Sequence, residues 1–336
     1  MSKPIKKIRI EIEDYVGGMN YDVSDKVVSI TKSMSMESTP GKCEVVLAYH
    51  PIFMRMGSIL RVWVNGLQWF NGRIFIDKHS SNGLITITAY DALHAFKGSD
   101  SMVFENKNLT QIFREICGYF GTIPVVHDTA RFVLPKVKTD GSTFFSVLMD
   151  GINRTLIGTG DLWVIRGNWH QVEFLNTRLH FNRNPRMLIV GDASLATDFS
   201  LTRSAENISN YVKLVNENNE DKVRHVAIAQ DYASQRQFGK LMTIEKSSDK
   251  LNYSQITDRA RQILQSKTNI KTTFDITLAG HETLLPLRSG DSVVVNLSDL
   301  YKFNLGMRNG LIDGISHRIE NDSYTVDLNL LMNVLA

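Results

Sequence analysis

Hydrophobic and polar residues alternate along the first 95 or so positions, as in strands that bury one face. Ile8, Ile10 and Ile12 alternate with charged residues, and a longer strand pattern runs over 68–78. The dipeptide Asn65-Gly66 precedes that stretch, and it favours the tight turn of a β-hairpin. Short strands with turn signals between them predict an antiparallel sandwich or barrel in this part of the chain.

Near residue 100 the hydrophobic period changes from two residues to the spacing of an amphipathic helix. Asn108 can cap this helix together with Gln111, and a second helix is expected over 142–156. Gly167-Asn168 is expected to be the two-residue turn of a hairpin. The middle of the chain is therefore predicted to be a small α+β unit. The apolar stripe of its first helix consists of Leu109, Ile112, Phe113, Ile116 and Phe120.

Strand patterns return after residue 198 and continue to the end of the chain, with one further helix expected over 254–267. The strands are expected over 207–215, 272–278, 292–297, 311–320 and 324–331. We expect a mainly β protein with α+β insertions and two similar antiparallel β-barrels. The predicted domains are a first barrel (1–97), a middle α+β domain (98–198), a second barrel (199–225 and 270–336) and a helix-containing insertion (226–269).

The two β regions resemble each other in sequence. Asn71-Gly72-Arg73-Ile74 matches Asn309-Gly310-Leu311-Ile312, and His79 and His317 follow at the same 238-residue separation. The strand before each of these two matching segments also begins after a glycine. A third strand follows each segment, and it matches when the alignment is shifted by one residue. These matches share one order, which favours a duplicated barrel. With two barrels in each chain, three copies could present six similar units in a ring. The preceding strands contain Gly57, Leu60, Val62 and Val64, and Gly290, Val293, Val295 and Leu297; the following strands pair Ile85, Ile87 and Ala89 with Tyr324, Val326 and Leu328.

Large side chains gather on one part of the first β region. If Leu60, Val62 and Val64 face the barrel core, then neighbouring residues on the same strand face outward. The residues of this candidate inter-subunit or partner interface are Arg61, Trp63, Trp69 and Phe75. Exposed apolar side chains of this size suggest an interface. The alternative is that other parts of the same chain cover both faces of the sheet.

Catalytic and metal-binding motifs are missing from the sequence. His281-Glu282 begins like a zinc-protease motif, but Leu285 occupies the position of the second histidine. His79 and His317 each stand alone at an expected strand end, where a hydrogen bond to backbone explains a histidine better than a metal does. Cys43 and Cys117 are expected to be buried, unreactive thiols in a reduced compartment. We therefore expect no enzymatic activity, no cofactor and no metal.

Composition adds little to this picture. The 38 Lys and Arg residues exceed the 35 Asp and Glu residues by three, too small a surplus to indicate nucleic acid or an anionic membrane. The basic N-terminus is not followed by the apolar stretch of a secretory signal, and no stretch has the length of a membrane span. We expect a protein made in the cytoplasm, with no membrane partner and no sequence-specific nucleic acid.

The order of several motifs resembles a known family, the tail hub (central baseplate hub) proteins of contractile-tailed bacteriophages and phage-tail-like bacteriocins. The likeness is to the type found in Gram-positive prophages and extends over nearly the whole chain. The motifs are Asn71-Gly72-Arg73-Ile74; Ile85-Thr86-Ile87-Thr88-Ala89-Tyr90-Asp91-Ala92-Leu93; Asn207-Ile208-Ser209-Asn210-Tyr211-Val212-Lys213-Leu214; Asp231 with Phe238-Gly239-Lys240-Leu241; Leu287-Arg288-Ser289-Gly290-Asp291-Ser292-Val293; and Ile315-Ser316-His317.

This resemblance implies a homotrimer whose two tail-tube-like barrels per chain form a pseudo-sixfold ring. Such a hub joins the sixfold tail tube, or a tube-initiator ring, to a threefold spike protein. It also implies contacts with other baseplate proteins and the tape measure, within a virion or a bacteriocin tail. The expected function is structural, a symmetry adaptor with no chemistry of its own.

Two other functions remain open at this point. A cell-wall hydrolase carried on the tail could use acidic residues of the middle unit, such as Asp128, Asp140 or Asp150. A carbohydrate-binding module that recognises host surfaces could use Trp163 and Trp169, which flank the expected hairpin. Ordinary packing across that hairpin is the simpler explanation for the two tryptophans.

Overall fold

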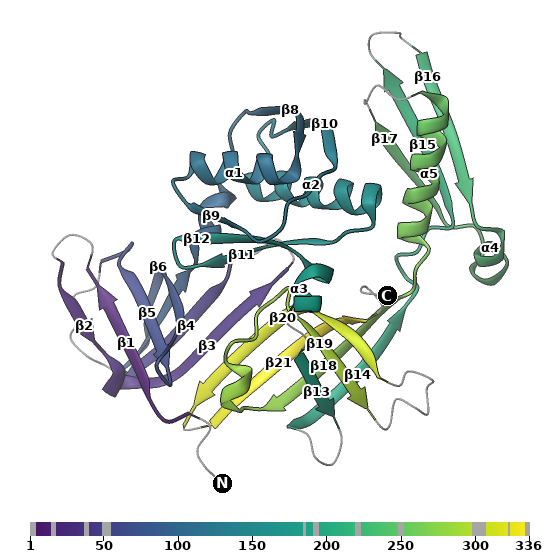
Figure 1. The fold of residues 1–336 in the computed structure, drawn as a ribbon. Coiled ribbons are helices and arrows are strands. Elements are labelled where there is room, and N and C mark those ends of the chain that lie inside the picture. Colours follow the sequence, from purple (N-terminus) through teal and green to yellow (C-terminus); the bar gives the residue numbers. More distant parts are fainter. Residues whose placement is uncertain are drawn as a thin grey trace.

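A large, mostly antiparallel sheet runs through both ends of the chain (Figure 1). The computed structural model describes residues 5–14, 18–36, 40–48, 55–183, 186–190, 195–218, 223–247, 252–297, 307–321 and 323–332. The chain is mainly β, with mixed α+β units, as the sequence predicts.

The first half of the large sheet comes from the N-terminal region. Its strands are β1 (Ile8–Glu13), β2 (Asn20–Asp22), β3 (Val27–Ser35), β4 (Lys42–Ala48), β5 (Ile59–Val64), β6 (Leu67–His79) and β7 (Leu84–Tyr90), with a 3-10 turn at Ser24–Lys26. They pair in the order β3-β4-β7-β6-β5-β1-β2. Asn65 and Gly66, with φ angles of 49° and 80°, form the predicted tight turn between β5 and β6.

The second half comes from the C-terminal region. Its strands are β13 (Arg186–Val190), β14 (Ala196–Ser204), β18 (Lys271–Ala279), β19 (Ser292–Leu297), β20 (Arg308–Glu320) and β21 (Ser323–Met332), with a 3-10 turn at Glu282–Leu284. They pair in the order β14-β18-β21-β20, and β19 links β20 to β13. β20 also pairs with β3, so this contact joins the two halves into one sheet.

One hydrophobic core serves both halves, because inward-facing residues of each belong to a single cluster. Alternation places side chains such as Ile30, Val45 and Leu328 in this core, while their neighbours in sequence face the other side. The sequence predicts two similar antiparallel β-barrels. The described strands of both halves form one continuous sheet, whose pairing follows an open path from β14 to β2, so no closed barrel forms among them.

The middle α+β unit lies over the large sheet (Figure 1). It contains a 3-10 helix at Ala92–Lys97, β8 (Val103–Asn108), α1 (Leu109–Tyr119), β9 (Ile123–Val126), β10 (Val133–Lys138), α2 (Phe144–Thr159), β11 (Trp163–Asn168), β12 (Gln171–Asn176) and α3 (Thr177–Arg183). The predicted cap is present, since the Asn108 and Gln111 side chains each accept a hydrogen bond from the other's backbone N–H at 2.9 Å. The hairpin turn was misplaced by the sequence pattern. It lies at Trp169-His170, and Trp169 adopts a left-handed φ of 64°.

A third unit projects from the rest of the molecule (Figure 1). It contains β15 (Tyr211–Asn218), β16 (Val223–Gln230), α4 (Tyr232–Phe238), β17 (Met242–Ser247) and α5 (Tyr253–Lys267). The sequence pattern assigned 199–225 to the second barrel, but β15 is the central strand of this small separate sheet. Val212 and Leu214 on β15 pack under α5, which explains the apolar pattern that suggested a barrel strand. Among the described residues, no helix is long and apolar enough to cross a membrane.

Candidate assembly interface

The internal repeat is present in the strand registers. Leu60 of β5 pairs with Gly72 of β6, and Val293 of β19 pairs with Gly310 of β20. Each long strand then has an irregularity at the equivalent place, between Ile74 and Ile76 in β6 and between Ile312 and Gly314 in β20. A shared irregularity at the same position supports a duplicated unit.

The turn before β5 and the turn before β19 have the same glycine conformation and the same backbone hydrogen bond. Gly57 and Gly290 have left-handed φ angles of 88° and 81°, a conformation that glycine adopts readily. Gly57 N–H donates to Ile74 O at 2.9 Å, and Gly290 N–H donates to Ile312 O at 2.8 Å. The repeat therefore fixes the same backbone geometry twice.

One part of the predicted correspondence is wrong. The sequence match equated Ile85 with Tyr324, but Ile85 pairs with His79 while Val326 pairs with His317. Ile85 of β7 therefore corresponds to Val326 of β21, two residues beyond the Tyr324 that the sequence match indicates. Side chains at every second position share a face, so a two-residue shift leaves the apolar pattern unchanged and invisible in the sequence.

The two halves join through one strand pair that has no counterpart among the described strands. Residues Gly314–Glu320 of β20 pair with Ser29–Ser35 of β3. The equivalent stretch of β6, residues 76–79, pairs with β7 on one side and with no described strand on the other. The strand order β14-β18-β21-β20 repeats the order β3-β4-β7-β6, so β14 is equivalent to β3. Among the described strands, β14 pairs only with β18. Among the described strands, one copy of each edge that pairs internally is therefore left free, on β6 and on β14.

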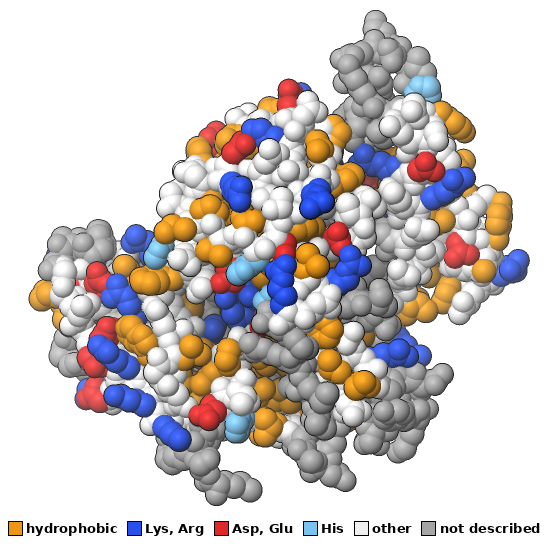
Figure 2. Space-filling view, viewed as in Figure 1, with side chains coloured by type: hydrophobic (Ala, Val, Ile, Leu, Met, Phe, Trp, Pro, Cys, Tyr) orange, Lys and Arg blue, Asp and Glu red, His pale blue; other side chains and the backbone are white. Residues whose placement is uncertain are grey.

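Large apolar side chains lie exposed at these two free edges. On β6, Phe75 is 44% exposed and Ile76 is 48% exposed, while on β14 Phe199 is 40% exposed. Free strand edges with exposed apolar side chains are typical of surfaces that pair with another chain. On the face shown in Figure 2, positive and negative side chains are interspersed with hydrophobic ones.

The structure places the four residues of the predicted interface in different surroundings. Arg61 forms an ion pair with Glu13, and the Arg9 guanidinium lies 5.1 Å from the Trp63 ring. Arg61 and Trp63 do lie on the face of β5 opposite its buried residues, as expected. Phe75 is exposed and packs 4.0 Å from the His94 ring. These contacts leave part of this face uncovered by the described residues.

Trp69 differs from the other three because it is only 4% exposed. Its Nε1–H donates to Leu285 O at 3.2 Å, and its ring makes an edge contact with His317 at 5.4 Å. Trp69 therefore fills the junction between the two halves and does not lie on the exposed face with Arg61, Trp63 and Phe75. The sequence placed it outside because β6 has an irregular register with β5 next to Trp63, which alternation does not reveal.

His317 and His79 match in sequence but not in environment. His317 is fully buried, and its ring nitrogens lie 2.8 Å from Tyr324 Oη and 3.1 Å from Leu287 O. Burial, aided by the nearby charge of Lys32, lowers the pKa of His317 to about 3. His79 is exposed at the end of β6 and lies 3.4 Å from Asp77. A backbone-bonded histidine, as expected, explains His317, and no group of three metal-binding side chains occurs among the described residues.

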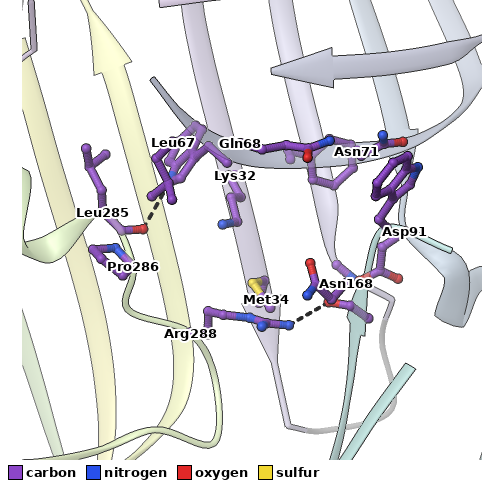
Figure 3. A pocket seen from close by; sticks show the side chains of 15 residues that line it. Lys32, Met34, Leu67, Gln68, Asn71, Asp91, Asn168, Leu285, Pro286 and Arg288 are labelled. Carbon is purple, nitrogen blue, oxygen red and sulfur yellow. Dashed lines mark hydrogen bonds between the residues drawn. The ribbon is translucent and has the colours of Figure 1, made fainter. Parts of the chain in front are cut away.

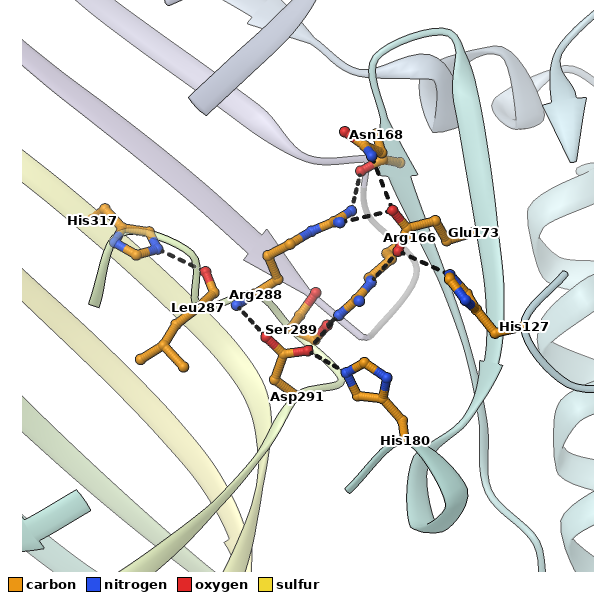
Figure 4. A network of polar contacts seen from close by, with 11 residues as sticks. His127, Arg166, Asn168, Glu173, His180, Leu287, Arg288, Ser289, Asp291 and His317 are labelled. Atoms are coloured by element: carbon orange, nitrogen blue, oxygen red, sulfur yellow. Dashed lines mark hydrogen bonds and ion pairs between the residues drawn. The ribbon is translucent and has the colours of Figure 1, made fainter. Parts of the chain in front are cut away.

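A buried charge network fastens the middle unit to the second half of the sheet (Figure 4). Arg166 on β11 donates to Glu173 at 2.8 Å and to Asp291 at 2.7 Å. Arg288 donates to Glu173 at 2.9 Å, and His180 lies 3.0 Å from Asp291. Burial alone would raise the pKa of Glu173, but Arg288 and Arg166 lower it to about 2. This network holds the β11–β12 hairpin against the loop before β19.

Sequence reasoning missed this network because it misplaced the hairpin turn. A turn at Gly167-Asn168 would set Arg166 opposite Trp169, whereas the true register sets Arg166 opposite Glu173. An opposite-charge pair at cross-strand positions was the signal that could have located the turn.

The residues considered for catalysis or sugar binding have structural contacts. Asp128 is buried and accepts hydrogen bonds from Arg183 at 2.8 Å and from Asn176 N–H at 3.2 Å. Asp140 and Asp150 are exposed and lie near Lys138 at 3.8 Å and Arg154 at 3.6 Å, respectively.

The two tryptophans of the hairpin are not side by side on an open surface. Trp163 is buried and stacks on Phe174 at 4.8 Å, while Trp169 is 43% exposed at the turn. Cys43 and Cys117 are buried, as predicted, and burial raises their thiol pKa values to about 12 and about 11. A thiol with such a pKa is not a nucleophile at neutral pH.

Comparisons with known proteins agree with this architecture. A family model described as YQBQ-like matches residues 30–331. The uncharacterized protein YqbQ of Bacillus subtilis (strain 168) is 23% identical over 220 residues, which are 64% of this chain. The chain spans 64% of that relative's length.

Solved structures with a similar fold include two bacterial tail proteins. The tail protein from Neisseria meningitidis MC58 is 14% identical with a TM-score of 0.71, covering 98% of both chains. The 43 kDa tail protein of prophage MuSo2 from Shewanella oneidensis is 13% identical with a TM-score of 0.68, covering 97% of this chain and 98% of that chain. At these identities the likeness is one of fold.

Proposed function

The chain belongs to the YQBQ-like family, and from this premise we propose that it is a structural tail hub whose copies close into a ring. The observation that carries the proposal is the pair of free edges on β6 and β14, which repeat the two edges that join β20 to β3 within the chain. Main-chain pairing of such edges between copies would bury both and extend the sheet around a ring.

The internal pairing predicts the register between copies. Ile315 of β20 lies opposite Met34 of β3. By the repeat, Ile315 corresponds to Asp77 of β6, and Met34 corresponds to Arg203 of β14. Asp77 of one copy would therefore lie opposite Arg203 of the next. Opposite charges at facing positions of paired strands stabilise the pairing, whereas like charges there destabilise it.

The two faces of the sheet suit a ring with a central channel. One face carries the apolar core, and the other carries small polar and charged side chains that alternate with it along the strands. In a closed ring the polar face would line the channel. Examples of the polar face are Thr31, Ser33, Thr273, Asp275, Ser316, Arg318, Asp327 and Asn329.

The stoichiometry follows from the duplication. Two similar halves per chain let three copies supply six repeats, which would match a sixfold tail tube or tube-initiator ring on one side. The threefold symmetry of the same ring would match a spike protein on the other side. Other baseplate proteins and the tape measure are further partners, in a virion or bacteriocin tail. Arg61, Trp63 and Phe75 are a proposed surface for these contacts, and the proposed role involves no catalysis.

A charge exchange at the predicted contact tests this assembly. Asp77→Arg and Arg203→Asp should each weaken the ring, because each puts like charges opposite one another, and the double variant should restore it. The association state is measured by size-exclusion chromatography with light scattering. Asp258 and Arg261 form an exposed pair within α5, 3.2 Å apart, and the same exchange there is the matched control. Single variants that assemble as well as the wild type would contradict the predicted register.

A further inference from the structure

A pocket beside the junction of the two halves contains a buried lysine without an anionic partner (Figure 3). The pocket has a volume of about 290 Å³ and lies between β3, the start of β6, the β11–β12 turn and the loop at 285–288. Lys32 is 6% exposed, and its ammonium lies 4.9 Å from the Trp69 ring. Within the described part of the chain, Lys32 forms no ion pair or hydrogen bond.

The other charged groups at the pocket have partners other than Lys32. Arg288 donates to Glu173 at 2.9 Å and to Gly167 O at 2.8 Å, so it belongs to the network described above. Asp91 accepts hydrogen bonds from Gly41 N–H at 2.9 Å and Leu93 N–H at 3.0 Å, and burial raises its pKa to about 7. No ion pair joins Asp91 to Lys32 among the described residues, so the buried ammonium lies at the pocket without a direct partner.

A second polar group at the pocket also lacks a partner. Asn71 lines the pocket and is 5% exposed, and its Nδ2 is buried with no hydrogen-bond acceptor among the described residues. The remaining wall is mostly apolar, with Trp69, Leu285 and Pro286 among the lining residues. A pocket of this size accommodates one or two amino-acid residues. One ammonium matches a singly charged carboxylate, whereas a phosphate would bring a second charge without a partner.

We propose that this pocket binds a carboxylate of a polypeptide segment, which accepts a hydrogen bond from Lys32 Nζ. The side chain next to that carboxylate would pack against the Trp69 and Pro286 walls. The pocket does not include residues 76–79 of β6 or 196–204 of β14. The site is therefore independent of the ring contact, and the two proposals fail or succeed separately.

Binding of small probes to the full-length protein tests this site. N-acetyl-leucine carries a terminal carboxylate, N-acetylglutamic acid α-amide carries only a side-chain carboxylate, and N-acetyl-leucinamide carries neither. We expect at least one of the two acids to bind, as measured by ligand-observed NMR, and the uncharged amide to bind about tenfold more weakly or not at all. The acid that binds more tightly identifies the source as a chain terminus or an acidic side chain.

Two variants locate the binding. Lys32→Met should weaken binding of the acid about tenfold or more. Lys7→Met, the same change at an exposed lysine, should leave it unchanged. Thermal unfolding of Lys32→Met checks that the variant is folded. Equal binding of acid and amide, or unchanged binding by Lys32→Met, would overturn the proposal. Inorganic phosphate that binds as tightly as the acids would overturn the choice of a carboxylate.

Discussion

At the scale of single residues, Lys32 combines a positive charge with nearly complete burial. Burial, with the repulsion of Arg288, lowers its pKa from 10.5 to about 7. Between these two values the unfolded chain holds a proton that the folded chain has released, so the free energy of unfolding should increase with pH. Lys32→Met should raise that free energy at pH 7 by about 1–4 kcal/mol, because it removes a buried charge without leaving a cavity.

Denaturant unfolding at pH 7 and pH 9 measures both effects. The wild type should gain stability over this interval more than Lys32→Met does, while Lys7→Met should follow the wild type. A Lys32→Met protein that is less stable than the wild type would mean that the ammonium is compensated in the folded chain. That result would also count against a ligand as the partner of Lys32.

At the scale of elements, the β11–β12 hairpin depends on Glu173, which lies between Arg166 and Arg288. Glu173→Gln should lower the free energy of unfolding by about 3–5 kcal/mol, because two buried guanidinium groups lose their shared partner. The pKa of Glu173 is about 2, below its ordinary 4.5, so its contribution is present above pH 4.5 and is lost as the pH falls toward 2.

Urea denaturation of Glu173→Gln checks this cost. Glu105→Gln is the matched control, since Glu105 forms an exposed ion pair with Lys136 at 2.7 Å, and it should leave stability nearly unchanged. Equal stabilities of the two variants would show that the hairpin is held by apolar packing alone.

Elements fixed by local chemistry were predictable from the sequence, and those fixed by distant contacts were not. The cap at Asn108 and the turn at Asn65-Gly66 depend on neighbouring residues, and both are present. The turn at Trp169-His170 carries no favoured turn sequence, because the pairing of Arg166 with Glu173 sets its position. β15 alternates like a barrel strand, and only its contacts with α5 reveal that it belongs to another sheet.

At the scale of the whole molecule, the sequence revealed the duplication but not how its two copies meet. The pairing of β20 with β3 joins segments nearly 300 residues apart, and no local pattern encodes such a contact. The same pairing also suggests which edges would meet between copies. Within the predicted interface, the sequence pattern correctly indicated that Phe75 is exposed. It could not indicate that Trp69 is buried, because the indole of Trp69 fills the junction between the two halves.

The mass of the purified protein in solution tests the central claim most directly. Light scattering over a concentration series should give a mass near three times the 38.0 kDa of one chain. Three copies would supply the six repeats that a closed ring requires. A mass of 38.0 kDa at every concentration, or a series of masses that grows without limit, would contradict a closed trimer formed through the edges of β6 and β14.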